Sequence, residues 1–165
     1  MVRNAVVLLW CVVVLVLVNR AILDKEQLLA EGRVVFLELA PVDPRSLMQG
    51  DYMALRFRIA DGAGSLQDAA DPARLNGTMV ALLDARSVAT FERLDDGQPL
   101  QANEVRLQYR VREGQVKFAT NAFFFEEGSA NLYEGARYGE FRVDDDGALL
   151  LTGMRGQNLE RLGPP

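Results

Sequence analysis

Residues 5–18 constrain the structure of this chain most, because the stretch contains no charged side chain and consists mainly of valine and leucine. Only Trp10 and Cys11 interrupt its aliphatic side chains. A helix needs about 20 mainly apolar residues to cross a bilayer, and residues 2–23 reach that length if the flanking polar side chains extend toward the headgroups. We therefore predict a transmembrane helix that continues through Glu31 and ends at Gly32.

The same segment permits two other interpretations. A cleavable signal peptide needs small residues at a fixed spacing before its cleavage site, and no such pair follows Val18. A core helix that is apolar on every face would need complete enclosure by a domain of this size. We favour an uncleaved signal anchor with its juxtamembrane extension at residues 1–31, followed by one soluble domain at residues 32–165.

The basic residues on the two sides of the apolar run set its orientation. Arg3 and the terminal amine lie before the run, and Arg20 and Lys25 lie after its centre, so the two sides are nearly balanced. A short N-terminal tail stays easily in the cytoplasm. We therefore expect a single-pass protein of the inner (cytoplasmic) membrane, with its soluble domain on the periplasmic side.

Composition narrows the chemistry of the soluble part. The chain carries a net charge of −5 without a basic cluster, has no histidine, and has one cysteine, Cys11, inside the apolar run. A nucleic-acid-binding domain would show a clustered basic face, and zinc sites draw on histidine and cysteine. We predict no catalytic residues, no cofactor, no metal and no nucleic-acid partner.

Alternating apolar and polar residues predict a mainly β domain. In residues 51–59, Met53, Leu55, Phe57 and Ile59 share one face, and residues 105–112 alternate most clearly. A short helix is expected over residues 129–138, with Ser129 as its N-cap. The other expected strands cover residues 33–39, 78–85, 88–94, 115–125, 141–143 and 148–151, and residues 66–75 are expected to form an irregular or helical link. We expect a small twisted barrel or sandwich with one short helix.

The segment 41–52 is the leading candidate for a binding site. It forms a long turn between two expected strands, with φ fixed at its prolines and freedom at Gly50. The charges could bind a partner from a rigid loop, or they could only staple the turn. The candidate binding residues, including the apolar positions that follow, are Asp43, Pro44, Arg45, Ser46, Gly50, Asp51, Tyr52, Leu55 and Phe57.

A secondary candidate cluster surrounds three consecutive phenylalanines at residues 123–125. A central strand buried on both faces would explain these rings, and the alternative is that Phe124 or a neighbour is exposed for a partner or the membrane. The cluster consists of Phe125, Glu126, Glu127, Gly128 and Arg137, in which an acid could pair with an arginine. Residues 144–147 resemble the start of a calcium loop but lack the rest of that pattern, so we expect a hairpin turn.

Residues 50–57 read Gly-Asp-Tyr-Met-Ala-Leu-Arg-Phe and resemble the signature of the GDYXXLXY protein family. Residues 41–47, 125–128, 136–138 and 147–150 are also similar to that family, so the resemblance spans nearly the whole chain. Phe57 replaces the final tyrosine of the signature. The resemblance implies a bacterial membrane-anchored protein that works beside larger membrane proteins, and it implies no established activity.

Residues 47–51 are also similar to the Leu-x-x-Gly-Asp step of signal peptidases, which use a Ser–Lys pair. The position of their nucleophile is occupied here by Val42, while Ser46 lies nearer the glycine and Lys117 is the only lysine of the domain. A hydrolase-like enzyme that uses carboxylates or Ser46 and Lys117 is therefore the alternative. The leading hypothesis is an accessory protein that binds a membrane or envelope partner, itself an integral membrane protein, through the 41–52 loop.

The signal-anchor prediction is tested by alkaline extraction of membranes that contain the full chain. We expect the intact protein to remain in the membrane pellet, because the apolar run is not removed. N-terminal sequencing of the recovered protein provides the control. A freely soluble protein that begins after Val18 would contradict the prediction.

Overall fold

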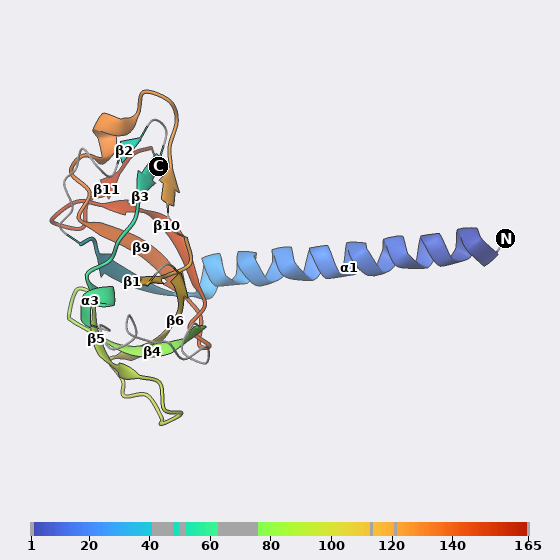
Figure 1. Cartoon of the computed structure of the whole chain (residues 1–165), viewed down its shortest axis with the longest axis horizontal. Coiled ribbons are helices and arrows are strands. Elements are labelled where there is room, and N and C mark those ends of the chain that lie inside the picture. Colours follow the sequence, from blue (N-terminus) through green and yellow to red (C-terminus); the bar gives the residue numbers. More distant parts are fainter. Residues whose placement is uncertain are drawn as a thin grey trace.

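The chain forms a long helix that stands out from one side of a β domain (Figure 1). The computed structural model describes residues 2–40, 48–49, 52–62, 76–112, 114–120 and 122–164. Helix α1 (Val2–Glu31) carries the N-terminus at its free end, and the C-terminus lies on the domain. The helix ends where the Gly32 amide donates to the carbonyl oxygen of Leu28 at 3.0 Å, as the sequence predicted.

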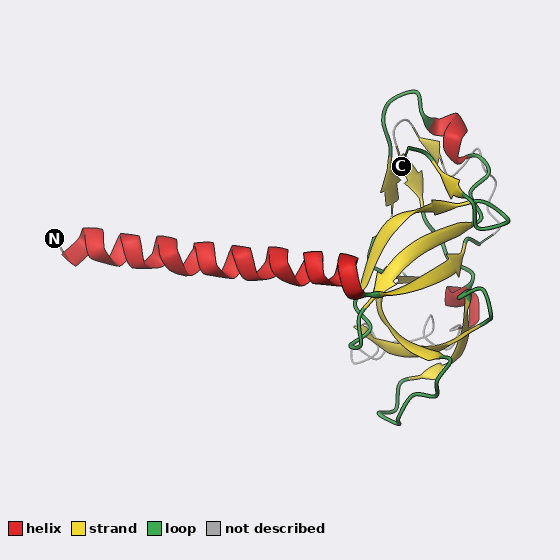
Figure 2. Cartoon of the chain, turned by 180° about the vertical axis from the view of Figure 1, so that it is seen from behind, coloured by secondary structure: helices red, strands yellow, loops and turns green. Residues whose placement is uncertain are grey.

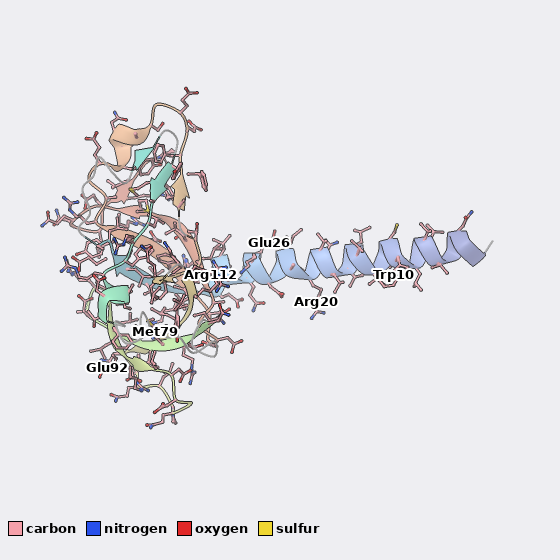
Figure 3. All side chains as sticks on the ribbon, viewed as in Figure 1. Trp10, Arg20, Glu26, Met79, Glu92 and Arg112 are labelled. Carbon is pink, nitrogen blue, oxygen red and sulfur yellow. The ribbon has the colours of Figure 1, made fainter. Side chains whose placement is uncertain are left out.

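Helix α1 is long and apolar enough to cross a membrane. An 18-residue window within Val6–Glu31 has a mean hydropathy of 2.7, and none of that window is buried. Trp10 and Arg20 project from the part of α1 that stands clear of the domain (Figure 3). The alternative of a buried core helix is therefore wrong. Only the domain end is packed, where Leu28 is buried at 5% exposure.

Antiparallel strands build the domain, and they form three sheets in the described residues. One sheet has the order β1-β9-β10-β11, with bounds β1 (Arg33–Glu38), β9 (Tyr138–Val143), β10 (Leu149–Arg155) and β11 (Arg161–Leu162). The second has the order β5-β4-β6-β7, with bounds β4 (Asn76–Leu83), β5 (Ala89–Leu94), β6 (Glu104–Arg112) and β7 (Gln115–Lys117). The third has the order β2-β3-β8, with bounds β2 (Met48–Gln49), β3 (Tyr52–Ala54) and β8 (Ala122–Phe124). The short helices are α3 (Ile59–Gly62) and the 3-10 helix η3 (Ala130–Tyr133).

Strand β1 connects these sheets. Along one edge it pairs with β9 from Arg33 to Glu38. Its other edge forms a parallel bridge from Phe36 to Val88, just before β5, and the following Leu39 forms an antiparallel bridge to Phe57, beyond β3. The sheets therefore curl around a common interior as a half-barrel (Figure 2).

The core lies inside this curl, and its described residues run from Val35 to Met154. Fully buried side chains come from β1, β4, β6, β9 and β10, and they include Val35, Leu37, Met79, Leu107, Phe141 and Met154. Figure 3 shows Met79 within the curled sheets and Glu92 at their outer margin. The ring of Phe57 meets the edges of Phe118 and Phe141, at centroid distances of 6.1 and 5.4 Å. The predicted mainly β fold, with one apolar N-terminal helix, is confirmed.

Three local predictions need correction. The expected strand at residues 51–59 is a strand only at Tyr52–Ala54, because its partner changes from β8 to the end of β1. Its alternation nevertheless holds, since Met53, Leu55, Phe57 and Ile59 are all buried. The expected strand at residues 115–125 is divided into β7 and β8, and Ala119 between them has a φ of 37°. Residues 66–75 lie outside the described residues.

The expected helix at residues 129–138 is the third correction. Only Ala130–Tyr133 is helical, as a 3-10 turn, and the Ser129 side chain makes no capping hydrogen bond. The main chain of Arg137 instead joins the sheet: its carbonyl accepts from Leu39 at 2.8 Å, and its amide donates to Arg155 at 2.8 Å. Sheet pairing therefore ends the helix before residue 137.

A matched pair of substitutions tests this core. Phe141→Ala should lower the free energy of unfolding by about 3–5 kcal/mol, because it leaves a cavity where a fully buried ring packs against Phe57. Phe124→Ala should lower it by about 1 kcal/mol or less, because that ring is 72% exposed. Urea unfolding of the full chain in detergent measures both. Equal losses would contradict the assignment of the core.

Candidate functional site

Most of the predicted binding loop lies outside the described residues. These positions include Asp43, Pro44, Arg45, Ser46, Gly50 and Asp51. Their part in binding stays a prediction. The structure describes β2 within the loop and β3, which begins at the last residue of the loop. It also describes three of the predicted site residues: Tyr52, Leu55 and Phe57.

Leu55 and Phe57 are buried, at 3% and 4% exposure. Phe57 packs between aromatic rings, and a backbone bridge joins it to Leu39 at the end of β1. The phenylalanine that departs from the expected signature thus occupies an apolar site. Any part that these two residues take in binding is indirect, because they hold the strand that carries Tyr52.

Tyr52 and Phe124 form a partly exposed aromatic pair above this core. They are directly opposite each other in the β3–β8 pairing, and their ring centroids lie 5.9 Å apart at a tilt of 43°. Tyr52 is half-buried, whereas Phe124 is 72% exposed. The edge position of β8 leaves this ring and the outer main-chain groups of the strand accessible to a partner.

The neighbouring phenylalanines point the other way. Phe123 and Phe125 pack against the buried ring of Tyr133, with centroid distances of 5.1 and 5.3 Å. The interpretation of residues 123–125 as a strand buried on both faces is therefore wrong. Its cause is the position of β8 at the edge of a small sheet, where only one face meets the core.

The remaining members of the secondary cluster are not an ion-pair site. Among the described residues, no ion pair joins Glu126 or Glu127 to Arg137. Glu126 and Glu127 lie on an exposed turn in which Gly128 has a φ of 80°. Arg137 contributes chiefly its main chain, and its Nη1 donates to the carbonyl of Ala136 at 3.2 Å.

A shallow pocket of about 390 Å³ lies beside the exposed ring of Phe124. It is lined by Phe124, Phe125, Glu126, Ser129, Tyr133 and Pro164. The pocket thus combines an exposed aromatic ring with a carboxylate and a hydroxyl. These are groups that contact a protein surface, and the described part of the pocket holds no nucleophile–base pair.

The alternative hydrolytic site rests on Ser46, which lies outside the described residues, and on Lys117. Lys117 is on β7, and its Nζ donates to Gln115 Oε1 at 2.7 Å. Within the described residues no group of histidine, cysteine, aspartate and glutamate side chains could hold a metal ion. Ser46–Lys117 chemistry stays a prediction.

Residues 144–147 form a hairpin turn between β9 and β10, as expected. Asp144 Oδ1 accepts from the Ala148 amide at 2.7 Å, which closes the turn. Gly147 has a φ of 85° and lies so close to the Arg106 main chain that a Cβ atom would meet it at 2.9 Å. The Gly147 carbonyl accepts from the Gln108 amide at 2.8 Å, so this turn fastens the β9–β10 hairpin to β6.

Glu104 is the buried carboxylate of the described part, at 5% exposure. Its Oε2 accepts from the Gln101 amide at 3.0 Å, and its Oε1 accepts from Arg93 Nη1 at 2.6 Å. Hydrogen bonding from Gln101 and then from Arg93 lowers the pKa of the Glu104 carboxyl. A carboxyl that acts as a general acid needs a raised pKa, so Glu104 serves the structure of the β5–β6 connection.

The lowered pKa of Glu104 predicts acid sensitivity. A carboxyl that titrates lower in the folded state stabilises the protein above its unfolded pKa, about 4.3, and this stabilisation is lost as the pH falls through the folded pKa. Glu104→Gln should reduce the stability at neutral pH and flatten the loss of stability below about pH 4.3. Unfolding midpoints across this pH range measure the effect. Exposed Glu92→Gln is the control, and an unchanged profile in Glu104→Gln would contradict the prediction.

Sequence reasoning left two features of the surface unassigned. It named Tyr52 and the exposure of Phe124 separately, but their contact depends on the register of β3 with β8. It also gave no indication that Lys25 of α1 and Lys117 of β7 line one groove. Neither feature has a local sequence signal, because both join segments far apart in the chain.

Comparison with known proteins gives one match. A family model described as GDYXXLXY protein matches residues 14–154, which run from the middle of α1 to β10. No curated protein and no solved structure matches the chain.

Proposed function

The chain belongs to the GDYXXLXY protein family, and on that premise we propose that it is a membrane-anchored interaction protein. Its β domain binds a membrane or envelope partner, itself an integral membrane protein, through the 41–52 loop and the adjoining ring pair of Tyr52 and Phe124. The observation that carries the proposal is the exposed ring of Phe124, which lies opposite the signature residue Tyr52 in the β3–β8 pairing.

The anchor supports this function through geometry. Helix α1 is apolar, exposed and packed only at its domain end, which suits a membrane tether. Residence in one membrane raises the effective concentration of the domain near another membrane protein, so a small interface is sufficient. As part of this proposal, the helix anchors the protein in the inner membrane and the domain faces the periplasm.

The described signature residues support the same function, because some are buried in the core and one is partly exposed. Met53, Leu55 and Phe57 are buried, and they fix the strand against the core. Tyr52 pairs instead with the exposed ring of Phe124, across the β3–β8 pairing. A loop that leaves from such a strand is held at its base, and rigid support of a surface loop is typical of binding sites.

Site-specific photocross-linking in native membranes tests the proposal. A photoreactive phenylalanine analogue at position 124 should give one discrete adduct with an integral membrane protein. The same analogue in place of exposed Glu92, on β5, should give none. The expected difference reflects the location of the interface on the β3–β8 sheet.

A loop variant completes this test. Asp51→Ala combined with Arg45→Ala should abolish the adduct at position 124, while the unfolding midpoint of the full chain stays close to that of the parent. Adducts of equal strength at positions 92 and 124, or an adduct that persists in the folded double variant, would contradict the proposal.

A further inference from the structure

Two grooves of opposite charge flank the domain end of α1. One groove, of about 910 Å³, lies where α1 meets β6 and the β9–β10 turn. Two arginines line it, Arg33 and Arg106. Six of its lining residues are acidic: Asp24, Glu31, Glu104, Asp144, Asp145 and Asp146. The arginines are already engaged, since Arg106 Nε donates to Asp95 at 2.9 Å and Arg33 Nη1 donates to the Glu104 carbonyl at 3.2 Å.

The second groove is basic. It has a volume of about 630 Å³ and is lined by Lys25 of α1 together with residues of β4, β6, β7 and the start of β10. Lys25, Arg110 and Lys117 line it, and none of its described lining residues carries a carboxylate. Lys25 and Lys117 are the two lysines of the chain. In a chain of net charge −5, three cations in one groove stand out, since the described lining has no acid to balance them.

The strand register places two of these cations directly against each other. Arg110 of β6 is the cross-strand partner of Lys117 of β7. Like charges directly opposite in an antiparallel pair are destabilising, so the sheet gains nothing from this choice of residues. Departures from local rules of this kind are expected where a surface serves binding.

The groove lies at the level of lipid headgroups when α1 is in a membrane. The membrane-spanning segment, residues 2–23, ends at Leu23, and Lys25 is two residues, about 3 Å along the axis, beyond it. Arg110 and Lys117 line the same groove as Lys25, so the domain adds two cations beside the helix near the headgroup level. Asn76 and Thr78 add neutral hydrogen-bonding groups to the lining.

We propose that the groove between α1 and the β6–β7 hairpin binds the headgroup of an anionic phospholipid from the leaflet that faces the domain. Lys25, Arg110 and Lys117 pair with the phosphodiester, and the amide and hydroxyl groups of Asn76 and Thr78 contact a hydroxylated headgroup alcohol. Guanidinium and ammonium groups are the side chains that bind phosphate, and basic residues next to a transmembrane helix recognise anionic lipids. This site rests on membrane insertion of α1, and it is separate from the partner surface at Phe124.

Lipid retention by the full chain tests the proposal. The protein is placed in nanodiscs of phosphatidylglycerol and phosphatidylcholine in equal parts, and native mass spectrometry counts the lipids that stay bound after release. We expect the parent protein to retain phosphatidylglycerol preferentially. The double variant Lys25→Gln and Lys117→Gln should retain at least about tenfold less, because each basic side chain near a membrane surface contributes about fivefold in affinity.

The matched control removes the same charge elsewhere. Arg86→Gln combined with Arg161→Gln takes two exposed cations from outside the groove and should leave the lipid preference unchanged. Lys25→Arg combined with Lys117→Arg should keep the preference, since the charges remain. If the double glutamine variant has a lowered unfolding midpoint, the single variant Lys25→Gln decides, because Lys25 is exposed on α1.

Three results would overturn the proposal. One is an undiminished preference in a folded groove variant, and another is an equal loss in the Arg86 and Arg161 control. The third concerns discs of phosphatidylcholine alone. If inorganic phosphate binds the protein there as tightly as phosphatidylglycerol does, the groove is a site for a soluble anion. These outcomes do not affect the partner test at position 124, so either proposal can fail without the other.

Discussion

The main-chain hydrogen bonds of β1 are the interaction on which the rest of the structure depends. This strand begins immediately after α1 and pairs along its whole length with β9. Its opposite edge is divided, since Phe36 bridges to Val88 and the following Leu39 bridges to Phe57. One strand therefore ties the anchor to all parts of the domain. Val35 and Leu37, on its inner face, are fully buried, so the same strand also supplies the centre of the core.

The division of that edge explains how the signature segment is used. Met53 pairs with β8, and four residues later Phe57 pairs with the end of β1. The apolar face stays directed inward across the change of partner, because side chains alternate along an extended chain whatever its neighbour. What remains for the surface is the start of the segment, where Tyr52 meets the exposed ring of Phe124. One alternating pattern therefore gives buried side chains at Met53, Leu55 and Phe57 and a partly exposed ring at Tyr52.

The attachment of α1 divides the charge of the domain face that surrounds it. On one side of α1 lies a groove whose charged lining residues are mainly acids, and on the other lies a groove whose charged residues, among those described, are all cations. The acidic side is stabilised internally: the Asp144 carboxylate closes a turn, and hydrogen bonds from Gln101 and Arg93 hold Glu104. On the basic side Lys117 donates to Gln115 Oε1, and Arg110 donates to the Ala119 carbonyl at 2.9 Å, so neither of these bonds neutralises a cation with a carboxylate. A membrane surface is the neighbour that such an arrangement suits.

The sequence by itself determined the features that depend on local order along the chain. The uncharged run predicted α1, and Gly32 predicted its end. Period-two alternation predicted β6 and the inward face of residues 53–59. Only the tertiary structure decided that residue 137 leaves its expected helix to pair with β1 and β10, and that Phe124 is exposed while its neighbours pack on Tyr133. It also decided that Lys25 and Lys117 line one groove. The physical reason is that alternation specifies which faces of a strand differ, whereas strand partners and register decide which face meets the core and which distant side chains become neighbours.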